Sequence, residues 1–496
     1  MRSLSYLEEY IDSIKDNNGR IGLFSVGHNA YWTQFPKLKE NIERHFKYFC
    51  KKLESYSKTN IIIFKEMCDS YSVSNEAGYF FSKEQLDLII CYIATYSPSS
   101  NTISVIQKIS DVPIILVSLQ PSAALDLENV TTEITLENVS ITSLPEISNA
   151  LSRMNKKPLD CIVGMLYDDK IAWDKIKNWC EVVSVAHKFK YDHIGLLGHV
   201  YEGMLDMNSD PTMFDAQLKM HVEHIEMEDL EKFIDEVTDK EIKNKIIEIK
   251  SIFELPYPVA DPITEKVKTE DLEWPARVSV GMDKMIYNFK LTGIAYYYRS
   301  LNDSKFERIH TGMIIGNSLL TSKGISISGE LDLKNCIAML IMNRFGTGGS
   351  FAEFYPINFM NDFVLVGHDG PHHLGIAEGR PVLRKLKVLH GKRGSGPSVE
   401  YKIKTGPISM LGLTQTFSGQ FKMIIAEGKS LKGLTPAIGN STTRVKFEID
   451  VRTFLEKWSI EGPTHHFALG IGHVAKKIEM LAKYLKIDSI LITPAQ

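Results

Sequence analysis

Between residues 20 and 200, short continuous apolar runs alternate with longer segments in which apolar residues recur at helical spacing. Uninterrupted Ile, Leu and Val indicate strands that are covered on both faces, as in a parallel sheet between two layers of helices. The expected strands are 20–26, 60–64, 86–94, 112–119, 159–166 and 193–199, and the helices between them include 37–56 and 171–187. This first part of the chain is therefore predicted to be α/β.

The middle of the chain carries more charge. Residues 223–253 place apolar side chains at helical spacing among many charged ones, which is typical of helices with a solvated face. Residues 269–287 are also amphipathic. Pro275 is expected to begin or kink a helix there, because proline lacks the amide hydrogen that a helix interior needs.

The last third changes to short alternating runs divided by Gly- and Pro-containing turns, such as DFVLVGH and QFKMIIAEG. This alternation predicts antiparallel strands that bury one face, in a small barrel or a sandwich. A helix over roughly 468–485 and a strand at 489–493 are expected to close the chain.

The length and these changes of pattern indicate three domains, since 496 residues at about 150 per domain give about three. A Ser-, Thr- and Asn-rich stretch precedes residue 158, and the pattern changes again near residue 325. We expect an N-terminal Rossmann-like α/β domain over 1–158, a central α/β domain over 159–325 and a C-terminal β-rich domain over 326–496.

Charge and composition exclude several classes of function. The 57 Lys and Arg against 61 Asp and Glu give a net charge of −4, which lacks the positive excess that nucleic-acid binding needs. No apolar run approaches the ~20 residues that cross a bilayer, so neither nucleic acid nor membrane is an expected partner. The six cysteines are scattered, and the charged first segment does not resemble a signal peptide. We therefore expect a cytoplasmic protein.

Two glutamates and several histidines of the last third stand in apolar surroundings. Glu353 lies within SFAEFY, Glu330 within SGELD, and His368 ends an apolar run. A buried charge is costly unless a partner or a metal compensates it. One divalent metal held by Glu330, Glu353, His368 and either His465 or His466 would explain these positions, and such mixed ligands suit Mn²⁺, Co²⁺ or Mg²⁺. From the residues alone, a surface glutamate, a core histidine or a paired buried charge remains an alternative at each position.

The segments SGELD, GTGGSFAEFY, NDFVLVGHDGP, KTGP and GPTHHF resemble the C-terminal half of the L-arabinose isomerase and L-fucose isomerase family, and its arabinose isomerase side most. The resemblance implies that family's fold, two Rossmann-like α/β domains followed by an antiparallel β-barrel-like domain. It also implies Mn²⁺ ligands at Glu330, Glu353, His368 and His466, with Glu330 and Glu353 as the catalytic acid and base. A homo-oligomer is implied as well, a trimer or hexamer with the sugar pocket between subunits.

The implied activity is that of a metal-dependent aldose–ketose isomerase, which converts a pentose or hexose, such as L-arabinose to L-ribulose, through an ene-diol. Ligands of open α/β sheets bind beyond the carboxyl ends of the strands. The expected sugar-binding residues are His28, Gln120, Tyr201, Glu202, Asp206 and His465. The N-terminal segments of the pocket differ from the family's pattern, which leaves the particular sugar open.

Two other functions fit the same pattern. A sugar-acid lyase or aldolase would use the same metal, and Lys392 with Arg393, or Arg444, would clamp the carboxylate of its substrate. A non-catalytic sugar sensor would need the α/β cleft but not the paired carboxylates and histidines.

Overall fold

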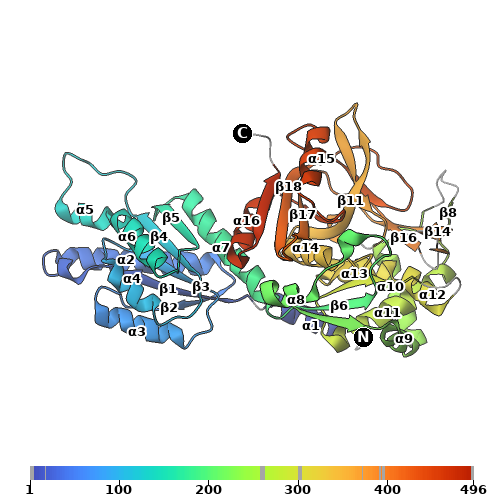
Figure 1. The fold of residues 1–496 in the computed structure, drawn as a ribbon, viewed down its shortest axis with the longest axis horizontal. Coiled ribbons are helices and arrows are strands. Elements are labelled where there is room, and N and C mark those ends of the chain that lie inside the picture. The colour runs from blue at the N-terminus through green and yellow to red at the C-terminus, as the bar shows by residue number, and fades with distance from the viewer. Residues whose placement is uncertain are drawn as a thin grey trace. The chain divides into compact units, whose positions relative to one another are not determined.

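The computed structural model describes residues 5–16, 18–256, 263–299, 304–370, 372–389, 392–393 and 397–492. The chain divides into two compact units, one of Asn17–Lys188 and one of Met1–Asp16 together with Phe189–Gln496. Figure 1 shows that each unit has its own parallel sheet with helices against it, and that the second also carries the barrel strands of the C-terminal part.

The unit Asn17–Lys188 is a doubly wound α/β fold. Its described strands are all parallel and run in the order β2-β1-β3-β4-β5. Phe49 packs against Tyr92 and Trp173 on one face, with ring centroids 4.7 and 5.2 Å away, whereas Phe81 belongs to the core of the other face. The strands are β1 (Arg20–Val26), β2 (Asn60–Ile63), β3 (Leu88–Ile93), β4 (Ile114–Gln120) and β5 (Asp160–Met165), and the helices are α2 (Pro36–Tyr56), α3 (Tyr71–Ser82), α4 (Ser99–Ile106), α5 (Thr132–Asn138), α6 (Ser143–Arg153) and α7 (Lys170–Phe189).

Strand β5 continues this first sheet. It pairs in parallel with β4, from Asp160 opposite Ile115 to Met165 opposite Gln120. The run after residue 158, which we expected to open the central domain, is therefore an edge strand of the first sheet. The polar stretch before it is a crossover that carries α5 and α6. The division into three domains stays a prediction, and its first boundary is best moved beyond β5.

The second unit begins with a smaller parallel sheet in the order β10-β9-β6-β7. Leu7, Ile11, Leu230, Met282 and Ile294 belong to one buried core, which joins this sheet to helices on one of its faces. The strands are β6 (His193–Gly198), β7 (His221–Ile225), β9 (Gly293–Tyr297) and β10 (Ser326–Ser328), and the helices are α1 (Ser5–Asp16), α9 (Met227–Asp235), α10 (Asp239–Ile252), α11 (Glu273–Phe289), α12 (Lys305–Gly312) and α13 (Ile314–Lys323).

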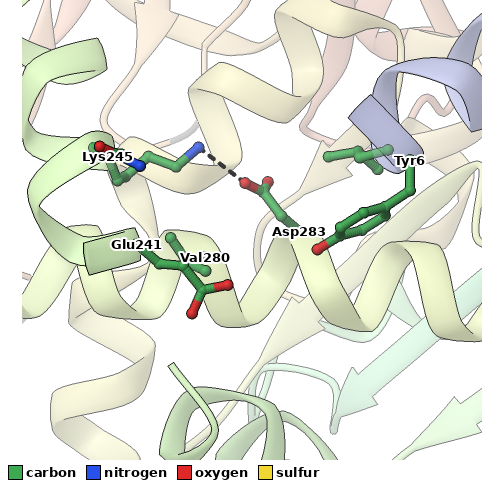
Figure 2. Close-up of a pocket in the computed structure, with 7 residues that line it drawn as sticks. Tyr6, Glu241, Lys245, Val280 and Asp283 are labelled. Carbon is green, nitrogen blue, oxygen red and sulfur yellow. Dashed lines mark hydrogen bonds and ion pairs between the residues drawn. The ribbon is translucent and has the colours of Figure 1, made fainter. Parts of the chain in front are cut away.

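The charged middle segment forms helices as expected, but its charges are not all solvated. Lys245 of α10 is only 2% exposed, and its Nζ lies 2.9 Å from Asp283 Oδ2 on α11 and 2.7 Å from Glu248 Oε2. Figure 2 shows this ion pair beside Tyr6 of α1. A buried lysine needs such partners because its charge is otherwise left without compensation in the protein interior.

The strands of the last third close into a barrel. They run β17-β20-β11-β12-β19-β18, every neighbour antiparallel, and β18 pairs back with β17. β21 is added outside this ring, parallel to β18. The members are β11 (Gly348–Asn358), β12 (Phe363–His368), β17 (Gly406–Gln415), β18 (Phe421–Leu431), β19 (Ser441–Lys446), β20 (Phe467–Ile471) and β21 (Asp488–Ile492). The expected β-barrel-like domain is confirmed.

Smaller elements complete the second unit. A short antiparallel sheet has the order β16-β13-β8, and β14 pairs with β15. These strands are β8 (Thr264–Glu265), β13 (Val382–Leu386), β14 (Val388–Leu389), β15 (Lys392–Arg393) and β16 (Pro397–Glu400), and helix α15 (Val451–Ile460) lies between β19 and β20 in the chain.

Helix α14 (Leu333–Arg344) lies between the parallel sheet and the barrel. Its residues from Leu333 to Met342 are all buried, which is typical of a helix packed on every side. It contacts β9 and β10 of the sheet and β11, β17 and β20 of the barrel. Its first turn therefore lies where the sheet and the barrel meet.

One expected element is wrong in its extent. The helix predicted over 468–485 is α16 (Ala475–Leu485), and Phe467–Ile471 is the barrel strand β20. β20 pairs with both β11 and β17, and this pairing, which joins distant segments, overrides the local apolar pattern.

In the described part of the chain, no helix is long and apolar enough to span a bilayer.

Candidate metal centre and active site

Three neighbouring barrel strands bring Glu353, His368 and His466 together. Glu353 of β11 pairs with Gly367, so it lies beside the residue that precedes His368 at the end of β12. On the other side, β11 pairs Ala352 with Phe467, which places His466 at the next step of the same ladder. One ligand atom from each of Glu353, His368 and His466 lies within 4.8 Å of the others.

Glu330 reaches the same place from the turn between β10 and α14. Its φ of 55° and the 57° of Leu331 are left-handed values, which cost side-chain-bearing residues about 1–2 kcal/mol each. The turn directs the Glu330 carboxylate so that Oε2 lies 3.4 Å from His466 Nε2 and 3.6 Å from His465 Nε2. Although burial raises it, the pKa of Glu330 is lowered overall by the close approach of His465 and by the charges of the histidines around it.

His466 is held by a carboxylate on its far side. Its Nδ1 lies 3.1 Å from Oδ2 of Asp332, the N-cap of α14, and both side chains are fully buried. Nδ1 then carries the proton, and Nε2 presents its lone pair toward Glu330. Burial lowers the pKa of His466 and outweighs the opposing effect of Asp332. The neutral imidazole is the form that binds a metal.

His368 is oriented in a similar way. Its Nδ1 lies 3.0 Å from Asp369 Oδ1, and its Nε2 lies 3.6 Å from Glu353 Oε1. Burial lowers the pKa of His368, but the hydrogen bond and charge of Asp369 and the charge of Glu353 raise it to about 9. The Phe351 ring packs against both histidines, with its centroid 4.4 Å from that of His368 and 4.3 Å from that of His466.

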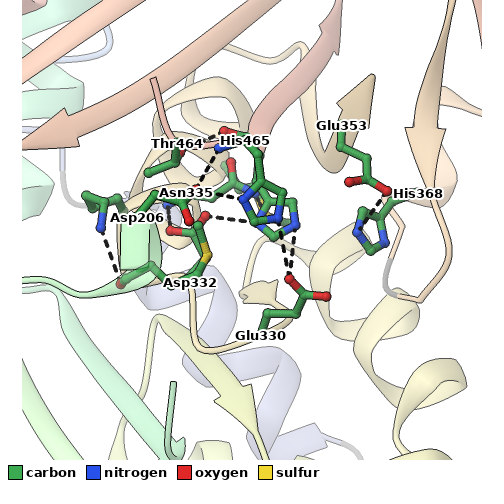
Figure 3. A network of polar contacts seen from close by, with 12 residues as sticks. Asp206, Glu330, Asp332, Asn335, Glu353, His368, Thr464 and His465 are labelled. Carbon is green, nitrogen blue, oxygen red and sulfur yellow. Dashed lines mark hydrogen bonds and ion pairs between the residues drawn. The ribbon is translucent and has the colours of Figure 1, made fainter. Parts of the chain in front are cut away.

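His465 points its two nitrogens at two carboxylates. Nδ1 lies 2.7 Å from Asp206 Oδ2, which also accepts from the His465 amide at 3.0 Å, and Nε2 faces Glu330 (Figure 3). Burial lowers the pKa of His465, whereas Glu330 and Asp206 raise it to about 9. Unlike the buried His466, the His465 side chain is 38% exposed, so it can also meet a ligand from outside.

The segment that carries Asp206 is fixed by a buried lysine. Lys334, in the first turn of α14, donates to Met207 O at 3.3 Å, Asn208 O at 2.9 Å and Ser209 Oγ at 2.8 Å. Its burial lowers the pKa of Lys334 despite the nearby carboxylates. Helix α14 thus positions His466 through Asp332 and, through Lys334, the loop that positions His465.

The converging donors fit a divalent cation. Among the residues that the structure describes, Nε2 of His466 and Oε2 of Glu330 are buried atoms that have no hydrogen-bond partner, as expected of ligand atoms that face a metal. Glu353 and His368 add a carboxylate and an imidazole on another side of the same cluster (Figure 3). Two carboxylates and two imidazoles suit Mn²⁺, Co²⁺ or Mg²⁺ better than the sulfur-rich sites of structural Zn²⁺.

The other expected sugar-binding residues have separate surroundings. Tyr201, after β6, packs on Tyr297 at 4.7 Å between centroids, and Glu202 is exposed and paired with Arg299. Burial, Tyr201 and the charge of Glu330 together raise the pKa of Tyr297 to about 12. Tyr201 thus packs on a ring whose pKa is influenced by Glu330, whereas Glu202 has no contact with the candidate metal centre among the described interactions.

His28 and Gln120 belong to the unit Asn17–Lys188. His28 follows β1 and packs against Tyr31 and Tyr96 at 5.1 and 6.0 Å between centroids. Gln120 ends β4 and donates to Ser122 O at 2.7 Å. Both therefore lie at the carboxyl edge of their sheet, where α/β folds bind ligands.

The sequence pattern did not predict the roles of Asp332, Lys334 and Phe351. Asp332 had a visible signal as a helix N-cap, and Phe351 shares the strand face of Glu353 two residues away. Lys334 had only the signal of a charge within a continuously apolar helix.

Residues 348–488 match the family model of the L-arabinose isomerase C-terminal domain. The match includes Glu353, His368 and His466 and the strands that carry them, and Glu330 lies before it.

Named relatives extend the likeness over most of the chain. It is 19% identical to "L-arabinose isomerase" of Bacillus subtilis (92% of this chain and 90% of that protein) and 22% identical to the Herpetosiphon aurantiacus protein of that name (91% of each). It is also 21% identical to "L-arabinose isomerase 1" of Bacillus licheniformis, over 67% of this chain and 66% of that protein. The chain is therefore similar to proteins named L-arabinose isomerase over most of its length, and residues 348–488 are similar to the C-terminal domain of that family.

Proposed function

We propose that this protein is a metal-dependent aldose–ketose isomerase that acts on a pentose or hexose of the L-arabinose and L-ribulose type. The observation that carries the proposal is that Glu353 with His368 and Glu330 with His465 form two groups of ligand atoms that share His466. Within the described residues, Glu330 Oε2 and His466 Nε2 are buried and have no hydrogen-bond partner. The names of the relatives support the reaction class, and the donor set supports a divalent cation such as Mn²⁺.

The reaction moves a proton between C1 and C2 and needs a base and an acid near those carbons. A divalent cation held by the four ligands would supply Lewis-acid polarisation of the two sugar oxygens. Glu330 and Glu353 enter the cluster from different elements, so one can take the proton at one carbon while the other serves the oxygens. Their nearest neighbours differ, because His465 and His466 lie beside Glu330 and His368 lies beside Glu353.

His465 and Asp206 are proposed to bind the sugar. The partly exposed imidazole of His465 lies against the Glu330 carboxylate, so a hydroxyl beside Glu330 would meet its Nε2. Asp206 holds the ring from the other nitrogen and fixes which nitrogen faces the sugar. Four more residues remain predicted sugar contacts, because they lie at or just after the carboxyl ends of parallel strands: His28, Gln120, Tyr201 and Glu202.

The lyase or aldolase hypothesis has no supporting contact in the described residues. The Arg444 guanidinium lies over the Phe363 ring, 5.3 Å from its centroid, and not in the cluster of ligands. The side chains of Lys392 and Arg393 lie outside the described residues. A cytoplasmic location and a trimer or hexamer stay predictions.

Removal and return of the metal test the proposal. The chelator-treated chain is expected to keep its circular dichroism spectrum, to lose aldose–ketose conversion and to regain it with Mn²⁺. A ligand that binds only the folded state at about 100 times its Kd adds about 2.7 kcal/mol of stability, so Mn²⁺ should also raise Tm. Full conversion in the chelated protein, or no effect of Mn²⁺ on Tm, would overturn the metal dependence.

A further inference from the structure

A second group of metal-binding side chains lies at the amino edge of the parallel sheet of the second unit. His193 and His221 are the first residues of β6 and β7, and they are direct partners in the parallel register. Glu223 lies two residues beyond His221 and therefore on the same face of β7. Its partner in β6 is Gly195, two residues beyond His193.

The atoms of this group converge. One ligand atom from each of His193, His221 and Glu223 lies within 4.8 Å of the others, and the imidazole rings of the two histidines are 4.8 Å apart between centroids. His193 Nε2 lies 2.7 Å from Glu223 Oε2, yet this buried nitrogen makes no aligned hydrogen bond within the described part of the chain. Two ligand atoms that lie this close without forming an aligned hydrogen bond can both point toward a metal ion bound beside them.

The backbone on which these side chains stand is fixed. The His221 amide donates to Asp192 O at 3.0 Å, and His193 O accepts from the Thr292 amide at 2.8 Å. The Asp192 side chain is held in turn by Arg344 Nη1 at 2.7 Å. A preformed frame of this kind reduces the ordering that a bound ion would require.

We infer that His193, His221 and Glu223 form a second, separate site for a borderline divalent transition-metal ion, of which Zn²⁺ is the probe. Two imidazoles and one carboxylate favour Zn²⁺, Co²⁺, Ni²⁺ or Cu²⁺ over Mg²⁺ and Ca²⁺, which prefer oxygen ligands. The site lies at the amino ends of its strands, whereas Glu330 follows the carboxyl end of β10 in the same parallel sheet. An ion here would join β6 to the edge strand β7 and would touch none of the residues of the candidate active site.

Counting bound Zn²⁺ by equilibrium dialysis of the full chain tests this inference. His221→Ala and Glu223→Gln should each remove one Zn²⁺ per chain, with an affinity loss of at least about tenfold at that site. His224→Ala is the matched control, because His224 is exposed on the opposite face of the same strand and should change nothing. Circular dichroism checks that each variant is folded.

The two metal centres can fail independently. If wild type binds two Zn²⁺ and His221→Ala binds one, the inference holds. If the wild-type chain binds one Zn²⁺ and the His221→Ala chain binds none, the inference also holds. In that case the candidate active site has lost its support as a zinc-binding centre. Equal Zn²⁺ counts in wild type, His221→Ala, Glu223→Gln and His224→Ala would overturn it, as would equal occupancy by Mg²⁺ at the same concentration.

Discussion

At the scale of single residues, Asp332 gives one carboxylate two tasks. Oδ1 of Asp332 accepts a hydrogen bond from the backbone amide of Asn335 at 2.9 Å and so caps α14. Oδ2 of the same carboxylate lies 3.1 Å from Nδ1 of His466. The same side chain thus begins a helix and selects which nitrogen of His466 is free to bind a metal.

Asp332→Asn should separate these two tasks. The asparagine oxygen can still cap α14, but its amide nitrogen would donate to His466 Nδ1 and move the ring proton to Nε2. We expect stability to change by less than about 1 kcal/mol and Mn²⁺ affinity to fall about 10- to 100-fold. Calorimetric Mn²⁺ titration beside a denaturant melt checks both, and unchanged Mn²⁺ affinity would contradict the role of Asp332.

Single residues also show what sequence can and cannot tell. Glu353 and His368 stand out because charged or titratable groups within apolar runs need a reason. The contact of Asp332 with His466 could not be predicted, because the two are 134 residues apart and meet only after the barrel has formed. Asp206 was visible as a polar residue after a strand, but not as the partner of His465.

At the scale of elements, α14 connects the loop after β6 to the candidate active site. Replacing Lys334 by Met should leave the acceptors on Met207 and Asn208 without a donor and release the loop that carries Asp206. We expect a loss of about 1–3 kcal/mol of stability, because buried acceptors lose their hydrogen bonds. Thermal and denaturant melts measure this loss of stability, with the exposed Lys240→Met as the control. Equal stability of the two variants would contradict the proposed role of Lys334 in holding the loop.

The ion pairs that Glu248 of α10 forms with Lys245 and Lys323 predict that the stability of the fold depends on pH in the acidic range. The pKa of Glu248 is lowered: burial raises it, but the charges and hydrogen bonds of Lys245 and Lys323 outweigh that effect. A lowered folded-state pKa contributes stability that is present above the ordinary value of 4.5 and is lost as the pH falls through the folded pKa.

Glu248→Gln should therefore destabilise the protein at neutral pH, and its difference from wild type should shrink as the pH drops below 4.5. Urea melts from pH 7 to pH 3 measure the difference. The exposed Glu456→Gln serves as the control and should show no comparable change. A Glu248→Gln difference that is constant over this range would refute the ion-pair contribution.

Most elements could be predicted because local periodicity determines them, as in the buried β3 and the amphipathic α2. The closure of the barrel could not be predicted from the sequence, because the strands of a sandwich and those of a barrel show the same alternating pattern. The distinction depends on β17 pairing with β18 as well as β20, a matter of the whole chain's order in space. β5 was assigned to the wrong sheet for the same reason.

At the scale of the whole molecule, the candidate active site depends on parts that are distant in sequence. A turn after the parallel sheet supplies Glu330, and three barrel strands position Glu353, His368 and His466. The unit Asn17–Lys188 carries His28 and Gln120, predicted sugar contacts at the carboxyl edge of its sheet. We therefore expect the choice of sugar to depend on these residues as well as on Asp206 and His465.

The most direct measurement is deuterium incorporation into sugars by NMR, with Mn²⁺ in D₂O, for wild type and Glu353→Gln. Wild type should place deuterium at C1 or C2 of at least one aldose–ketose pair. Glu353→Gln should keep its fold and lose about 10²- to 10⁴-fold in rate, the usual contribution of a general acid or base. No exchange across pentoses, hexoses and 6-deoxyhexoses, or near-normal exchange in Glu353→Gln, would contradict the proposed function.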